Sequence, residues 1–158
     1  MARYGLLSQG SVFVYPAPGI RTRRPEATIK RIIAAPHLPP AVGPYSAGVV
    51  AGPFVLVAQG PIAPGSGEIV GSTVAEQASR VLENIELVLR EVGASRADVV
   101  RVTVYLADID QYAAMNQVYR DFFQIDFPSR IVIEATRLPL GLLVEMEAVA
   151  LLPEGPEA

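Results

Sequence analysis

Three charged side chains stand inside apolar segments near the C-terminus. Arg130 opens one such segment, and Glu145 and Glu147 interrupt another. Removing an ion from water is costly unless a partner or a ligand compensates, so charges inside strand-like segments require an explanation. A guanidinium can bind an anionic group while a nearby carboxylate acts as an acid or base. These residues therefore predict a small site for an anionic molecule.

The spacing of these charges indicates how they would meet. Side chains alternate between the two faces of a strand, so Arg130, Val132 and Glu134 share one face. Glu145 and Glu147 also point the same way, about 7 Å apart. If these two strands pair, Arg130 lies near one carboxylate while the other borders a cavity. A structural ion pair on a half-exposed sheet accounts for the same pattern, because ion-pair networks also place charges in this way.

Two polar residues outside these segments are further candidates. Asn116 interrupts an apolar helical stripe, where a carboxamide needs hydrogen-bond partners. Tyr45 follows Gly43 and Pro44 in a rigid turn just before a predicted strand. Structural roles also explain both, as a helix-to-sheet hydrogen bond for Asn116 and a loop anchor for Tyr45. His37 stands among prolines and is expected to be a solvated loop residue.

The composition argues against several classes of protein. The 158-residue chain has no cysteine and one histidine, which excludes thiolate nucleophiles and makes a Cys- or His-based metal site unexpected. A net charge of -3 and a pI near 5.2 argue against a nucleic-acid partner. The chain is 51% hydrophobic and 18% charged, without a stretch suited to span a bilayer. We therefore expect no membrane partner and a homo-oligomer that buries apolar surface between subunits.

One domain is expected, from residue 28 to residue 152. Residues 1–27 hold glycines, prolines and four arginines, with no acid before Glu26, and predict a flexible or interface-packed extension. An organellar transit peptide is the alternative, although the glycines and prolines would interrupt its amphipathic helix. Residues 153–158 form a short acidic tail.

Hydrophobic periodicity orders the domain as strand, hairpin, helix, strand, helix, strand, strand. Thr73 and Glu76 have the spacing of a capping box, and Gly93 ends the first helical stripe. The predicted class is α+β, with a mixed six-stranded sheet and two helices on one face. Its other face would be uncovered and calls for a partner subunit. Strands are predicted over residues 28–35, 46–51, 54–59, 98–106, 129–135 and 143–151, and helices over 73–93 and 108–123.

Several short motifs follow one another along the predicted domain. They are Gly43-Pro44-Tyr45-Ser46, Glu83-Asn84-Ile85, the segments 102–108, 115–119 and 122–123, Phe127-Pro128-Ser129-Arg130, Arg137-Leu138-Pro139 and the segment 144–148. In order and spacing these motifs resemble the Rid family, the YjgF-like reactive intermediate deaminases. The resemblance covers roughly residues 28–152.

The resemblance implies a chorismate-mutase-like (YjgF-like) fold, assembled as a cytoplasmic homotrimer with three clefts between subunits. It also implies a deaminase that works without metal or cofactor and hydrolyses 2-enamine and 2-imine acids to 2-keto acids and ammonia. Carried over by position, Arg130 matches the arginine that binds the substrate carboxylate, and Glu145 the glutamate that positions the attacking water. Tyr45 and Asn116 match residues that line the cleft.

Two residues expected at the substrate site depart from the usual family pattern. Gln59 stands where a serine is usual, and Val132 stands where the best-known members have a cysteine. Both are expected to line the substrate site, where Gln59 would change which side chains fit. A small-molecule-binding or chaperone-like trimer without turnover is the alternative function. Ribonuclease activity is a third hypothesis, which the acidic charge balance disfavours.

Overall fold

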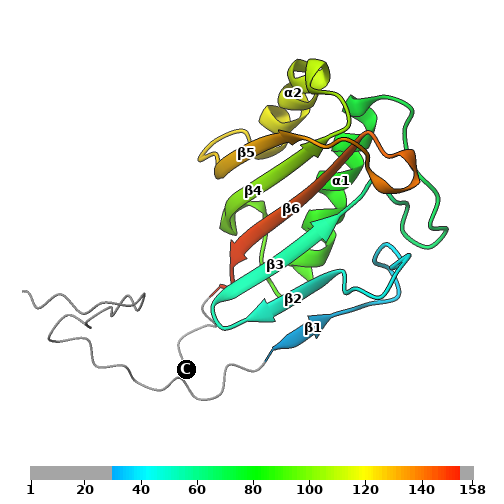
Figure 1. Ribbon diagram of the computed structural model, residues 1–158. Coiled ribbons are helices and arrows are strands. Elements are labelled where there is room, and N and C mark those ends of the chain that lie inside the picture. The colour runs from blue at the N-terminus through cyan, green and yellow to red at the C-terminus, as the bar shows by residue number, and fades with distance from the viewer. Residues whose placement is uncertain (1–29, 154–158) are drawn as a thin grey trace, which may run out of the picture.

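Six strands form one mixed sheet in the order β1-β2-β3-β6-β4-β5 (Figure 1). This computed structural model describes residues 30–153, so the predicted extension 1–27 and almost all of the tail 153–158 lie outside the described residues. Strands β4 and β5 run parallel, and the other neighbouring pairs run antiparallel. The strands are β1 Arg31–Ile33, β2 Gly48–Ala51, β3 Phe54–Gln59, β4 Val99–Leu106, β5 Ser129–Glu134 and β6 Val144–Leu151.

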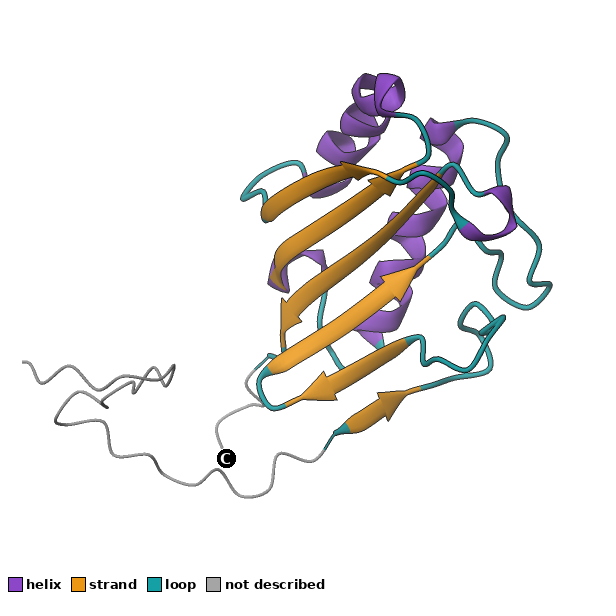
Figure 2. Ribbon diagram, viewed as in Figure 1, coloured by secondary structure: helices purple, strands orange, loops and turns teal. Residues whose placement is uncertain are grey.

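Two helices, α1 Val74–Arg90 and α2 Tyr112–Phe123, cover one face of the sheet (Figure 2). The predicted capping box is present: the Thr73 hydroxyl oxygen accepts from the Glu76 amide at 3.3 Å, and the Glu76 carboxylate accepts from the Thr73 amide at 3.0 Å. These bonds satisfy amides that would otherwise have no partner at the helix start. The α+β class, the mixed sheet and the placement of the helices are confirmed.

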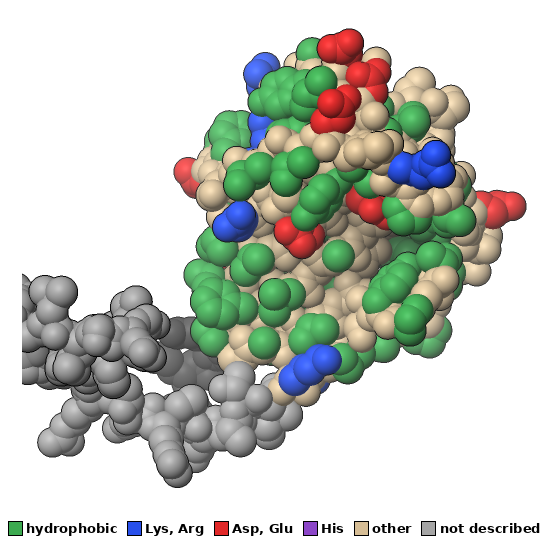
Figure 3. Space-filling model, viewed as in Figure 1, with side chains coloured by type: hydrophobic (Ala, Val, Ile, Leu, Met, Phe, Trp, Pro, Cys, Tyr) green, Lys and Arg blue, Asp and Glu red, His purple; other side chains and the backbone are tan. Residues whose placement is uncertain are grey.

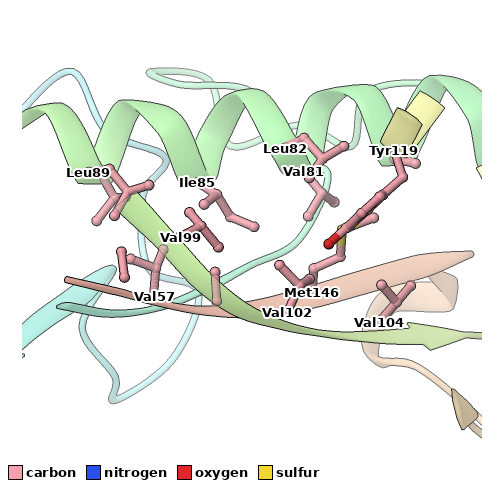
Figure 4. Packing of buried hydrophobic residues seen from close by; sticks show 14 of the residues in the cluster. Val57, Val81, Leu82, Ile85, Leu89, Val99, Val102, Val104, Tyr119 and Met146 are labelled. Atoms are coloured by element: carbon pink, nitrogen blue, oxygen red, sulfur yellow. The ribbon is translucent and has the colours of Figure 1, made fainter. Parts of the chain in front are cut away.

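The hydrophobic core lies between α1 and the sheet (Figure 4). Side chains of α1 at steps of three and four point down onto valines of the central strands. Among the largest side chains that are fully buried are Leu82, Ile85 and Leu89 from α1, and Met146 from β6. The sheet and α1 therefore form a rigid base for the loops at their ends. No helix within residues 30–153 has the length and apolar character needed to cross a membrane.

The order of the strands corrects one prediction. The last two strands, β5 and β6, do not pair, because β4 lies between them and hydrogen-bonds to both. The β4–α2–β5 unit is a parallel crossover, which places β5 directly beside β4. Strand β6 then enters antiparallel between β3 and β4. Arg130 and Glu145 are therefore separated by a strand.

The buried stripe of the second helix differs from the predicted one, which comprised Ile109, Tyr112, Ala113, Asn116, Tyr119 or Arg120, and Phe123. A 3₁₀ turn over Ile109–Gln111 precedes α2. Met115, Tyr119 and Phe123 are buried, whereas Tyr112 is exposed. Asn116 consequently lies at the edge of the buried stripe, facing β5 rather than the centre of the core.

The sheet face opposite the helices is open and largely apolar (Figure 3). Charged side chains interrupt this face at only a few places in the view shown. Large exposed apolar surface of this kind is typical of a protein–protein interface. Residues that contribute to the face include Phe54, Leu56, Ile131, Ile133 and Leu151, each between 43% and 48% exposed.

Candidate active site

Arg130 is held by neutral groups of α2. Its Nη2 donates to Asn116 Oδ1 at 2.7 Å and to the Tyr112 hydroxyl at 3.0 Å. Its guanidinium carbon lies 4.3 Å from the centre of the Tyr119 ring, a cation–π distance. Burial raises the pKa of Tyr119 to about 12, so this ring stays neutral at physiological pH. No acidic side chain within residues 30–153 pairs with Arg130, which leaves its charge available to an anion.

A cavity of about 320 Å³ lies beside this guanidinium. We call it the arginine cavity. Two of the polar groups that line it are the charged fork of Arg130 and the carboxamide of Asn116, and aromatic rings supply much of the rest. The Nε and Nη1 donors of Arg130 have no protein acceptor among the described residues, so each of these nitrogens can donate to a carboxylate oxygen. Its lining residues are Asn116, Tyr119, Arg120, Phe127, Pro128 and Arg130.

A larger cavity of about 520 Å³ surrounds Glu145. We call it the glutamate cavity. It lies where loops before β2, after β3 and after β5 gather at one end of the sheet (Figure 1). Most of its lining is apolar, and its carboxylates come from β6. The polar and apolar residues that line it include Tyr45, Gln59, Tyr105, Leu140, Glu145 and Glu147.

Glu145 and Glu147 differ in their surroundings. Glu145 is half-buried, and burial raises the pKa of its carboxyl above the ordinary range. No hydrogen bond or ion pair to Glu145 is formed by the described part of the chain. Glu147 is exposed and accepts from the Tyr105 hydroxyl at 3.3 Å. Glu145 is thus the carboxylate that is both shielded from solvent and free to contact a bound water.

Buried carboxamides of α1 hold the loops of the glutamate cavity. Asn84 Nδ2 donates to the carbonyls of Gly60 and Ile62 at 3.0 and 2.8 Å. Gln77 Oε1 accepts from the amide of Leu143 at 2.8 Å, just before β6. Sequence reasoning missed both as functional residues. The sequence pattern that could have identified them is a pair of carboxamides seven positions apart on one apolar helix face. Residues at this spacing point the same way, so both side chains need polar partners on the buried side of the helix.

Tyr45 and Gln59 are anchored to the loop that precedes β2. The Tyr45 hydroxyl oxygen accepts from the amide of Val42 at 3.2 Å, and Gln59 Nε2 donates to the carbonyl of Ala47 at 3.0 Å. Both residues line the glutamate cavity. At Gly60, an added Cβ would lie 3.7 Å from Glu145 Oε1 and 3.2 Å from Leu142. The absence of a side chain at Gly60 therefore keeps space open beside the carboxylate.

The structure divides the predicted site residues into two groups. Arg130 and Asn116 line one cavity, and Tyr45, Gln59 and Glu145 line the other. Paired residues share a face, so the pairing of Arg130 with buried Val102 directs it toward the helices.

Glu145 instead pairs with Tyr105 on the open face. The prediction that Arg130 and Glu145 meet is therefore wrong within a single chain, because they project from opposite faces. Val132 packs against the core and lines neither cavity.

Comparison with protein families identifies the chain. A family model described as Endoribonuclease L-PSP matches residues 35–152. The chain belongs to the Rid (YjgF, L-PSP) family. It is 48% identical over 122 residues to a RutC family protein of Pyrococcus abyssi, covering 77% of this chain and 96% of the relative. It is 39% identical over 129 residues to a 2-iminobutanoate/2-iminopropanoate deaminase of Capra hircus, covering 81% of this chain and 93% of that enzyme.

A solved structure also matches this Rid protein. The crystal structure of Escherichia coli TdcF with bound serine has a TM-score of 0.72 and 36% identity, covering 77% of this chain and 98% of TdcF. The Rid fold is thus shared across nearly the whole length of these relatives. In the described part of this Rid chain, no three His, Asp or Glu side chains are grouped so as to hold a metal ion.

Proposed function

We propose that this protein hydrolyses reactive 2-enamine and 2-imine acids to 2-keto acids and ammonia in the cytoplasm. The observation that carries the proposal is a pair of opposite charges, each beside a cavity and neither paired with an opposite charge within residues 30–153. Arg130 offers the unpaired Nε and Nη1 donors of a charged guanidinium to the carboxylate that every such substrate has. Glu145 offers a partly desolvated carboxylate to a water molecule.

The site is proposed to form between chains of a homotrimer. Arg130 and Glu145 project from opposite faces of one sheet, so one cleft can use both only if they come from different copies. The open apolar face supplies surface that such an assembly would bury. Each cleft would then contain the arginine cavity of one copy and the glutamate cavity of the next.

The reaction follows from these positions. Arg130 holds the substrate carboxylate and places the imine carbon near the water beside Glu145. Glu145 accepts a proton as the water oxygen bonds to that carbon, and the electrons of the C=N bond move to nitrogen. The proton held by Glu145 and the proton of the new hydroxyl group then pass to nitrogen, and the C–N bond breaks as the C=O bond forms, which releases ammonia and leaves the 2-keto acid. The imine carbon is already electrophilic, so positioning and charge stabilisation supply the catalysis.

A turnover assay tests the proposal. An amino-acid oxidase generates 2-iminopropanoate in situ, and semicarbazide traps the free imine as it forms. We expect the protein to reduce trapping and to accelerate release of pyruvate and ammonia over the rate without protein. The alternative is a binding trimer, which would bind 2-keto acids in calorimetry but leave trapping unchanged. That result would remove the enzymatic proposal.

The rate should depend on pH through Glu145. Burial raises the pKa of this carboxyl, and only its ionised form can accept a proton from water. As pH falls through the raised pKa, kcat/KM should fall by about tenfold per pH unit. The midpoint should lie above the ordinary glutamate value of about 4.3. The pH profile of the Glu145→Gln variant should lack this fall, and a profile that keeps it would assign the titration to another group.

A further inference from the structure

The turn after β5 contains an unexpected residue. Leu140 and Gly141 both have positive φ, at 56° and 74°, and the amide of Leu142 donates to the carbonyl of Pro139 at 3.1 Å. Two central residues at positive φ with this hydrogen bond define a type I′ turn. Such turns strongly favour Asn-Gly or Asp-Gly, because a Cβ at positive φ is strained. Leucine at the first central position therefore destabilises the turn.

Core packing does not compensate for this strain. The flanking residues Leu138 and Leu142 are 6% and 3% exposed, but Leu140 is 65% exposed. A large apolar side chain is thus held both in a strained backbone conformation and in solvent. Strained residues that persist in a structure tend to occur at functional sites. Leu140 lines the glutamate cavity, together with Val42, Ile62 and Pro139, which are also apolar.

The charges of this cavity restrict which ligand groups can approach Leu140. The cavity contains the carboxylates of Glu145 and Glu147, and neither is paired with a cation within residues 30–153. An acidic side chain on the ligand would be repelled by them. An apolar side chain would instead bury surface against Leu140 and its neighbours.

We infer that Leu140 is a specificity residue, whose side chain contacts the side chain of the substrate. The preferred substrates are then 2-imino acids with apolar side chains larger than methyl, such as those derived from leucine or methionine. The inference rests on the proposed function, since it assigns the substrate side chain to the cavity that holds Glu145. It goes further by naming the class of side chain and the residue that selects it.

The test compares wild type with Leu140→Asn, which restores the favoured Asn-Gly turn. Binding of pyruvate and of 4-methyl-2-oxopentanoate, the keto acid of leucine, is measured by calorimetry. Wild type should bind the larger keto acid more tightly than pyruvate. In the variant, the ratio of the two affinities should fall by about tenfold. Its Tm should rise by about 2–4 °C, because the strain is relieved. The matched control is Ile125→Asn, at an exposed residue that lines neither cavity.

The outcomes separate this inference from the proposed function. If wild type turns over imines but the preference is unchanged in Leu140→Asn, Leu140 does not select substrates and the deaminase proposal stands. If keto acids bind with the expected preference but no imine is turned over, the deaminase proposal fails and Leu140 still selects ligands. If no keto acid binds, or if the variant no longer assembles, the inference is overturned.

Discussion

Replacing Arg130 with alanine is expected to lower kcat/KM for imine hydrolysis by about 30- to 5,000-fold. Losing the partner of a desolvated carboxylate costs roughly 2–5 kcal/mol, because the remaining charge is left unpaired. Tyr112 and Asn116 are neutral and cannot replace the guanidinium. The assay is the imine-trapping experiment, with the fold checked by circular dichroism.

Two further variants sharpen this prediction. Arg130→Lys keeps the charge but removes the planar fork, so its activity should lie between those of wild type and the alanine variant. Arg90→Ala is the matched control, because Arg90 is an exposed residue of α1 whose ion pair with Glu86 contributes little. Equal activity of Arg130→Ala and Arg90→Ala would remove Arg130 from the site.

Mixing two inactive variants is expected to restore activity. In a trimer whose clefts each take Arg130 from one chain and Glu145 from the next, Arg130→Ala and Glu145→Gln damage different halves of the cleft. When the two chains are refolded together in equal amounts, about one quarter of the clefts should receive both native residues by random assembly. The mixture should therefore recover about a quarter of wild-type turnover, far above either variant alone.

The control for this experiment is a mixture of two variants that cannot complement each other. Chains with both substitutions, refolded with Arg130→Ala, supply no native Arg130 and should recover nothing. Mass measurement must show that each variant assembles as wild type does. Assembled mixtures that remain inactive would mean that the two residues do not share a cleft, and the composite site would be wrong.

Local signals predicted the individual elements well. The predicted strand 54–59 coincides with β3, because a hairpin turn marks one end and a proline follows the other. Helix α1 begins after Thr73 as predicted, since its capping box is a contact between residues three apart. The first strand is shorter than predicted, covering Arg31–Ile33, because an edge strand extends only as far as its partner pairs with it.

Local sequence patterns did not predict which distant strands pair. The position of β6 between β3 and β4 depends on contacts between segments far apart in the sequence, which periodicity does not encode. The sequence therefore identified Arg130 and Glu145 but misplaced them relative to each other. The roles of Gln77 and Asn84 were missed for the same reason, because their partners lie in loops distant along the chain.

The bonds made by Gln77 and Asn84 have an evolutionary consequence. They end on the main-chain carbonyls of Gly60, Ile62 and Gly71, which every residue type supplies, and on the amide of Leu143, which every residue type except proline supplies. Loop positions other than Gly60 and Gly71, where an added Cβ would be crowded, can therefore mutate without breaking these bonds. A helix that anchors its loops in this way lets selection explore new ligand preferences while the underlying architecture is inherited unchanged.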